Sequence, residues 1–171
     1  MTDQIGVVEL EAQQVVFVTL RTDMENLGDA LETALLEAWE YTERQHLEVT
    51  GPPLTRYHVF SEEGIELSAG FPVTAASSVE ALDPPVNGDG AVRAADSSVR
   101  AELGELPACA AASVTYVGSY LNLPQAYRAL GEWIVEQGLT PAGAPWEVYT
   151  SDPAQIADPE KWETRVYWPV R

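Results

Sequence analysis

The heptapeptide GAPWEVY at residues 143–149 and the heptapeptide GPPLTRY at residues 51–57 share the pattern Gly-x-Pro-x-x-x-Tyr. Further along the chain, FPV at residues 71–73 and WPV at residues 168–170 each place an aromatic residue before Pro-Val. Patterns that recur in the same order indicate an internal duplication. We therefore interpret the chain as two copies of one supersecondary unit.

The sequence upstream of the first heptapeptide predicts a strand followed by a helix. The β-branched run at residues 13–20 is typical of a buried strand. Residues 24–45 then carry apolar side chains at every fourth position, which is typical of an amphipathic helix. Thr22 and Glu25 have the spacing of a capping box, which predicts the start of this helix.

The second half repeats this order. Residues 108–116 predict the equivalent strand, and a helical pattern begins at Asn122 and Pro124 and stops at Gly138. Each unit is then expected to be strand, helix, strand, strand. The remaining predicted strands are 54–60 and 65–71 in the first half, and 99–103 (a short edge strand), 146–150 and 163–168 in the second.

Length and composition fit a single domain over residues 1–171, because 46% apolar content is enough for one sizeable core. We predict an α+β fold in which two pseudo-twofold units share a mostly antiparallel sheet, with one helix of each unit packed on it. The first unit spans about 7–73 and the second about 99–171, joined by a crossover loop at 74–98. Residues 1–12 are interpreted as a polar lead into the first strand.

Charge and cysteine content exclude several functions. The chain has 27 acidic and 9 basic residues, for a net charge of −18, which would repel a phosphate backbone and argues against direct nucleic-acid binding. One interpretation of this acidity is a host with a high-GC genome or an adaptation to salt. The other is a cleft that attracts cationic ligands, and the net charge alone does not decide between them. Cys109 is the single cysteine, and the sequence has no Cys/His cluster with metal spacing. No membrane span or signal peptide is evident, so we expect a soluble, cytoplasmic protein without metal or cofactor.

The motifs placed above resemble those of the GyrI-like small-molecule-binding family, which comprises effector domains of multidrug-responsive transcription activators and free-standing proteins. The resemblance covers nearly the whole chain. It implies a central ligand cleft between the two halves, lined by aromatic and acidic residues, in which lipophilic cations stack on rings. The motifs that carry it are GPPLTRY at 51–57, GFPV at 70–73, LPA at 106–108, GSY at 118–120, PWEVY at 145–149 and YWPV at 167–170.

With this resemblance we predict seven ligand-binding residues, which are Tyr57, Tyr120, Trp146, Glu147, Tyr149, Arg165 and Tyr167. Glu147 falls two residues before Tyr149 and therefore shares its strand face. The aromatic positions that match the family's cleft are Tyr57, Tyr120, Trp146 and Tyr149.

The chain departs from the family at Arg165, where relatives usually carry a glutamate four residues before the final proline. On a strand, Arg165 shares a face with Glu163 and Tyr167, which we take as the cleft side. We hypothesise that Arg165 binds an anionic or polar ligand directly, or pairs with Glu147 or Glu163. The alternative is that Arg165 lies at the rim with its head in water.

The predicted function is a free-standing binding protein that captures an amphipathic aromatic molecule for sequestration or effector sensing. A transcription regulator is the protein partner that the resemblance suggests. The alternative is a hydrolase of small reactive electrophiles, with Glu147, Tyr120 and Tyr149 as catalytic groups. Binding without catalysis is the expectation we carry forward.

Overall fold

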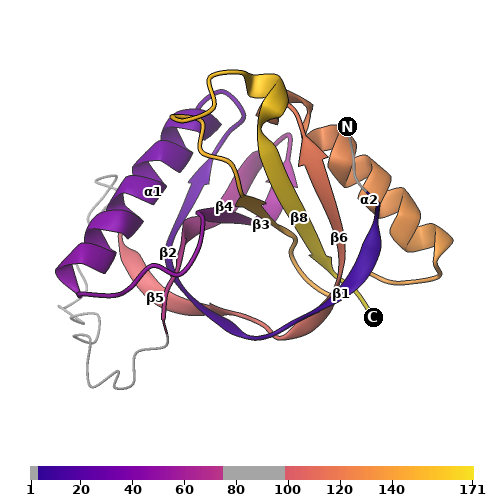
Figure 1. Ribbon diagram of the computed structural model, residues 1–171, viewed down its shortest axis with the longest axis horizontal. Helices are drawn as coiled ribbons and strands as arrows, with labels where there is room; N and C mark the ends of the chain where they lie inside the picture. The colour runs from indigo at the N-terminus through magenta and orange to yellow at the C-terminus, as the bar shows by residue number, and fades with distance from the viewer. Residues whose placement is uncertain (1–3, 75–98) are drawn as a thin grey trace.

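The structure is a computed structural model that describes residues 4–74 and 99–171 (Figure 1). Apart from Thr74, the predicted crossover loop at 74–98 lies outside the described residues. The elements are β1 (Gly6–Leu10), β2 (Gln13–Thr22), α1 (Leu27–Arg44), β3 (Leu54–Ser61), β4 (Gly64–Pro72), β5 (Ala101–Leu106), β6 (Cys109–Val117), η1 (Tyr120–Asn122), α2 (Pro124–Glu136), β7 (Trp146–Tyr149), η2 (Pro159–Lys161) and β8 (Glu163–Pro169).

The strands form one antiparallel sheet in the order β1-β6-β8-β7-β3-β4-β2-β5. The sheet curls, and α1 and α2 lie on its outer side, one over each half (Figure 1). β1, β2 and β5 run beneath the central strands in the view of Figure 1. The predicted α+β class, with a helix from each unit packed on a shared antiparallel sheet, is confirmed.

The two halves meet at β3 and β7, and their register makes the duplication visible in space. Thr55 pairs with Glu147, which is its own counterpart in the repeat, since each is the fifth residue of its heptapeptide. On either side of this pair the backbone bonds are reciprocal: Tyr57 N donates to Pro145 O at 3.1 Å and Tyr149 N donates to Pro53 O at 3.0 Å. A pseudo-twofold axis therefore passes between Thr55 and Glu147.

The edge strands are exchanged between the halves. β1 begins the first half of the chain yet pairs with β6 of the second half, whereas β5 begins the second half and pairs with β2 of the first. The edge strand predicted at 99–103 is present as β5. The interpretation of residues 1–12 as a lead was wrong, because they contain β1. The repeat signals this strand: Leu-x-Ala at 10–12 matches Leu-x-Ala at 106–108.

The start of α1 also differs from the prediction. The helix begins at Leu27 and Asn26 is its N-cap residue, so Thr22 and Glu25 do not form a capping box. Thr22 instead ends β2, and the Asp23 side chain accepts hydrogen bonds from the Asn26 backbone (2.9 Å) and amide (2.8 Å). The turn between strand and helix is thus held by an aspartate that the capping-box pattern overlooked.

The close approach of β4 to β2 requires a glycine at Gly70. A Cβ placed there would lie 1.7 Å from the Val16 carbonyl oxygen and 3.1 Å from the Phe17 Cα, both in β2. Only glycine allows β2 and β4 to approach so closely. The inner side of the sheet then holds a small apolar cluster around Val15, Phe17, Leu54, Leu106 and Trp146.

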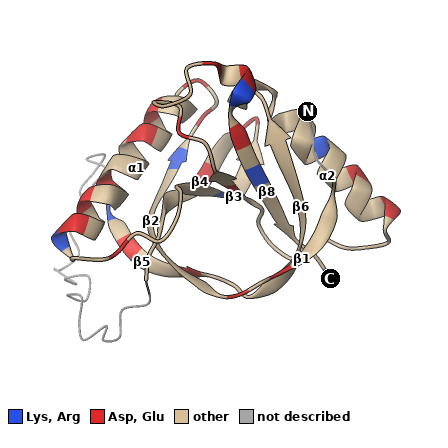
Figure 2. Cartoon of the chain, in the orientation of Figure 1, with Lys and Arg blue, Asp and Glu red and all other residues tan. Residues whose placement is uncertain are grey.

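Acidic residues lie along both helices, on the outside of the molecule (Figure 2). Within residues 4–74 and 99–171 we find no helix long and apolar enough to cross a membrane. The same residues contain no group of three or more His, Cys, Asp or Glu side chains arranged to hold a metal ion.

Candidate functional site

Glu147 lies in a row of buried side chains that crosses the sheet on its helix-bearing face. Cross-strand pairing places Val114 and Val166 on one side of Glu147, and Thr55 and Ala69 on the other. Val114 and Val166 pack with α2, and Ala69 packs with α1. Glu147 and Thr55 therefore occupy the gap between the two helices, where Glu147 is 4% exposed and Thr55 is fully buried.

Tyr149 holds the Glu147 carboxylate. Its hydroxyl lies 2.8 Å from Glu147 Oε2 and 3.0 Å from Thr55 Oγ1. A tyrosine hydroxyl carries one proton, so it cannot donate to both. When Glu147 is ionised, Tyr149 must donate to the carboxylate and accept from Thr55. When Glu147 is protonated, the direction of this hydrogen-bond chain is able to reverse.

Aromatic rings surround the carboxylate. The Tyr120 ring contacts Tyr149 edge-on, with centroids 5.5 Å apart, and lies 4.6 Å from the Trp162 ring. Tyr57, from β3, and Tyr127, from α2, complete the ring set. All five rings are half-buried, so parts of them face solvent while the carboxylate below them is closed off.

Burial raises the pKa of Glu147 to about 7, and the hydrogen bond from Tyr149 limits the rise. Tyr127 lies close enough to lower the same pKa. Its hydroxyl nevertheless forms no hydrogen bond of good geometry within the described part of the chain. We conclude that Tyr149 holds the carboxylate, whereas the Tyr127 hydroxyl keeps its hydrogen-bonding capacity. Burial, and next the charge of Glu147, raises the pKa values of Tyr57, Tyr120 and Tyr127, so these hydroxyls stay protonated.

This arrangement has the chemistry of a receptor for small molecules: a buried acid beneath accessible aromatic faces. The sequence agrees with the geometry, because the sequence model of the GyrI-like small molecule binding domain matches residues 3–171. The chain belongs to the GyrI-like family. No curated protein sequence matches it.

Several solved structures share the fold. The chain superposes on the C-terminal domain of EcmrR with a TM-score of 0.77 at 19% identity, covering 98% of this chain and 97% of that domain. In the EcmrR–DNA complex the match has a TM-score of 0.76 at 19% identity, covering 98% of this chain but 57% of EcmrR.

Two further structures are similar. The hydrolase encoded by lin2189 from Listeria innocua has a TM-score of 0.64 at 14% identity, with 98% of this chain and 92% of that chain covered. SAV2435, solved bound to tetraphenylphosphonium, has a TM-score of 0.59 at 11% identity, with 99% and 94% covered. At these identities the likeness shows the fold alone.

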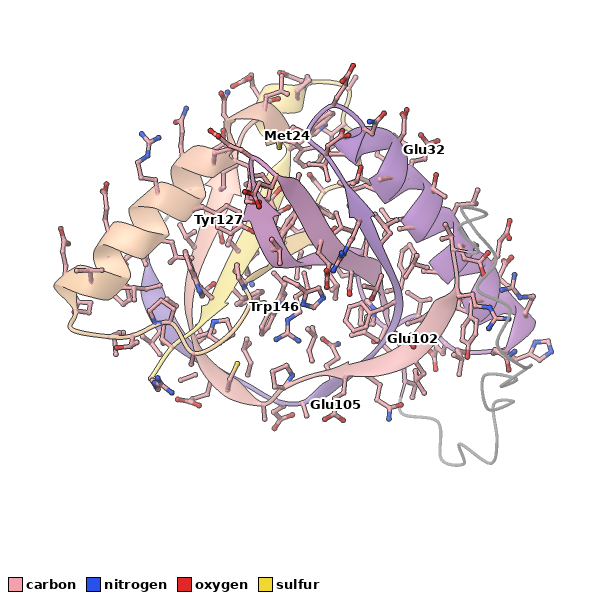
Figure 3. The ribbon with its side chains drawn as sticks, turned by 180° about the vertical axis from the view of Figure 1, so that it is seen from behind. Met24, Glu32, Glu102, Glu105, Tyr127 and Trp146 are labelled. Carbon is pink, nitrogen blue, oxygen red and sulfur yellow. The ribbon has the colours of Figure 1, made fainter. Side chains whose placement is uncertain are left out.

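The GyrI-like sheet separates the predicted ligand-binding residues into two groups. Tyr57, Tyr120, Glu147 and Tyr149 gather on the helix-bearing face. The side chains of Trp146, Arg165 and Tyr167 point to the inner face, because Trp146 pairs with Tyr167, and Arg165 pairs with Val148 next to Glu147 (Figure 3 labels Trp146 inside the curl and Tyr127 beside α2). The seven residues therefore cannot line one cleft.

Arg165 does not neutralise Glu147. The two side chains leave the sheet on opposite faces, so the hypothesised pair is wrong. Arg165 is exposed, and its Nε donates to Thr115 Oγ1 at 3.4 Å. Glu163, the other hypothesised partner, accepts a hydrogen bond from Thr150 at 2.9 Å. Arg165 thus lies at the surface, where the Tyr167 hydroxyl and, more weakly, the charge of Glu163 raise its pKa. Its role in ligand binding stays a prediction.

Four residues of this candidate site were not predicted from the sequence: Thr55, Tyr127, Trp162 and Thr164. Thr55 is found by aligning the heptapeptides, since it stands where Glu147 stands. Tyr127 fits the apolar stripe of the helical pattern that ends at Gly138, although a buried tyrosine hydroxyl needs a polar neighbour. Thr164 pairs with Tyr149 across β8, and its hydroxyl is buried without a partner in the described residues. No sequence signal marks Thr164.

Replacing Tyr149 with phenylalanine should raise the pKa of Glu147 above about 7, because the hydrogen bond that favours the ionised carboxylate is removed. An NMR titration of the Glu147 carboxyl carbon measures this directly. Tyr41→Phe on α1 is the matched control and should leave that pKa unchanged. An unchanged or lower pKa in Tyr149→Phe would contradict the assigned hydrogen bond.

Proposed function

We propose that this protein captures an amphipathic organic cation with aromatic groups, and that Glu147 and the surrounding tyrosines form its binding site. The observation that carries the proposal is the buried carboxylate without a positive partner. Among the described residues, no ion pair involves Glu147. A buried carboxylate of this kind is unfavourable when ionised, and a cationic ligand removes that penalty.

The rings supply the rest of the affinity. A cation over a tyrosine or tryptophan face gains about 0.5–2 kcal/mol, and more when water is excluded. The unpaired hydroxyls of Tyr127 and Thr164 are available for a ligand's polar groups. The Tyr120 ring covers Tyr149, so a bulky ligand reaches Glu147 only if Tyr120 swings aside. Tyr120 lies in the short η1 turn and not in the sheet, which suits it to such a movement.

Capture of this kind serves sequestration or effector sensing. The implied protein partner is a transcription regulator.

The charge of the ligand is testable with two molecules of one shape. Tetraphenylphosphonium and tetraphenylborate differ in charge, and we expect the cation to bind at least about tenfold more tightly at pH 8, equivalent to about 1.4 kcal/mol. Calorimetry or tryptophan fluorescence measures both. Glu147→Gln should reduce the preference to the part that the overall negative charge gives, and lowering the pH below about 7 should weaken cation binding as Glu147 takes up a proton.

Glu132→Gln, which removes an exposed carboxylate on α2, is the control and should keep the preference for the cation. Equal affinity for the two probes, or an unaffected preference in Glu147→Gln, would refute the proposed site. Comparing Glu147→Gln with Glu132→Gln at pH 8 separates the local effect of Glu147 from the effect of overall charge. Both variants change the net charge equally.

Hydrolysis of small electrophiles is the second candidate, and one observation favours it. A pKa of about 7 is suited to a general base near neutral pH, and the Tyr149 hydroxyl lies 2.8 Å away to hold or pass a proton. Turnover of a panel of epoxides and activated esters, lost in Glu147→Gln, would establish it. Absence of turnover together with retained cation binding would leave binding as the function.

A further inference from the structure

A hollow of about 270 Å³ opens on the inner face of the sheet, away from Glu147. Its walls include the aliphatic side chains of Leu54, Leu106 and Val148 and the rings of Trp146 and Tyr167. These rings lie 5.8 Å apart at an angle of 35°. For comparison, a dry cavity of about 150 Å³ holds benzene. The hollow is therefore large enough for two fused rings.

The hollow arises where the two halves of the duplication differ. The aligned motifs place Trp146 and Tyr167 of the second half at the positions of Leu54 and Gly70 in the first. These residues form equivalent cross-strand pairs, Trp146 with Tyr167 and Leu54 with Gly70. At this cross-strand pair the second half places two aromatic rings on the inner face. The first half places only one leucine side chain there, which leaves space unfilled. Gly70 cannot be enlarged to compensate, because β2 lies against it.

The lining defines the kind of molecule that fits. Tyr167 is half-buried and offers a ring surface to a ligand, whereas Trp146 is 3% exposed and has the Arg56 guanidinium 5.8 Å from its ring centroid. The aliphatic walls exclude water from an apolar body. Exposed Glu11, Gln13 and Thr50 give the rim hydrogen-bond acceptors. The charges near the hollow are mixed, because Glu11 lies at the rim and the Arg56 guanidinium lies over the Trp146 ring on the same face of the sheet. We propose that this hollow is a second small-molecule site, which takes a flat bicyclic aromatic molecule of the indole class with an N–H or O–H donor directed at the rim.

The second site is independent of the proposed function at Glu147. Neighbouring residues of β7 point to opposite faces, so Trp146 and Val148 line the hollow while Glu147 and Tyr149 face the helices. A ligand in one site does not touch a ligand in the other. Failure of cation binding at Glu147 would leave the hollow unaffected, and the reverse also holds.

An NMR titration with indole tests the proposal. We expect saturable shifts of the backbone amides at residues 10–13, 50–54 and 106, with little change around Tyr120. Val148→Phe, which extends a ring into the hollow, should weaken indole binding at least about tenfold. Thr50→Trp, which covers the rim from an exposed position, should do the same and serves if Val148→Phe does not fold. Both variants should still bind tetraphenylphosphonium if the Glu147 site exists.

Three results would overturn the second site. Indole shifts centred on Tyr120 and Tyr127 that vanish in Glu147→Gln would place indole in the other site. The absence of saturable shifts would show that the hollow takes no such molecule. Unchanged indole affinity in folded Val148→Phe and Thr50→Trp would show that indole binds elsewhere.

Discussion

Replacing Glu147 with glutamine should raise the free energy of unfolding by about 3 kcal/mol at pH 8 and leave it nearly unchanged at pH 4. Folding raises the pKa of Glu147 from 4.5 to about 7. Each pKa unit between the folded and unfolded states corresponds to about 1.4 kcal/mol. Because the folded value is the higher one, the protein has its full stability from this group below about pH 4.5 and loses it as the pH rises to about 7. Glutamine keeps an acceptor for Tyr149 but never ionises.

Urea denaturation of both proteins from pH 4 to pH 8 measures this difference. His58 titrates in an overlapping range with the opposite sign, because burial lowers its pKa and its contribution is lost as the pH falls. His58 is present in both proteins, so subtracting the two curves isolates Glu147. Glu132→Gln should run parallel to the wild type. Parallel curves for Glu147→Gln would mean that the carboxylate is not buried as described.

Gly70→Ala should destabilise the protein by at least about 4 kcal/mol, a large part of the 5–15 kcal/mol typical of a domain. The added methyl would overlap the Val16 carbonyl oxygen, and its nearest neighbours are all backbone atoms. Backbone cannot turn aside as a side chain does, so β2 and β4 would have to separate. Thermal and urea denaturation, with soluble yield, measure the loss.

Gly131→Ala on α2 is the matched control, and we expect it to change the free energy of unfolding in the opposite direction. A Cβ at Gly131 would meet only the Trp168 ring, at an ordinary 3.8 Å. Alanine is favoured over glycine inside a helix by about 0.5–1 kcal/mol, so this variant should be slightly more stable than the wild type. If Gly70→Ala stayed within about 1 kcal/mol of the wild type, β2 and β4 would not be as close as they are here.

The order of the helices and strands could be predicted from the sequence because short repeated motifs reveal the duplication. Each Gly-x-Pro turn precedes a central strand, and each aromatic-Pro-Val triplet marks the end of the strand that follows. β1 escaped prediction because its apolar run is short and does not alternate with polar residues, and because Val7 and Val8 both face solvent at the sheet edge. The start of α1 escaped because the Asp23 turn and the Thr22–Glu25 pattern compete for the same few residues.

The site was predictable in part. Alternation along β7 places Glu147 and Tyr149 on one face, and the equivalent alternation in β3 adds Tyr57. Whether Arg165 lies on the same face as Glu147 depends on the register between β8 and β7. The sequence of either strand alone does not determine that register. Tyr127 and Trp162 reach the site from a helix and a loop, so only the packed structure brings them to Glu147.

The exchanged edge strands β1 and β5 make this chain resemble a domain-swapped dimer joined into one polypeptide. Each half needs a strand from the other to finish its share of the sheet, and β1 must find β6 about a hundred residues away. Neither half is then a folding unit by itself. Folding is expected to be slow and all-or-none. A ligand that binds at the centre of the sheet, where β3 pairs with β7, would therefore stabilise both halves at once.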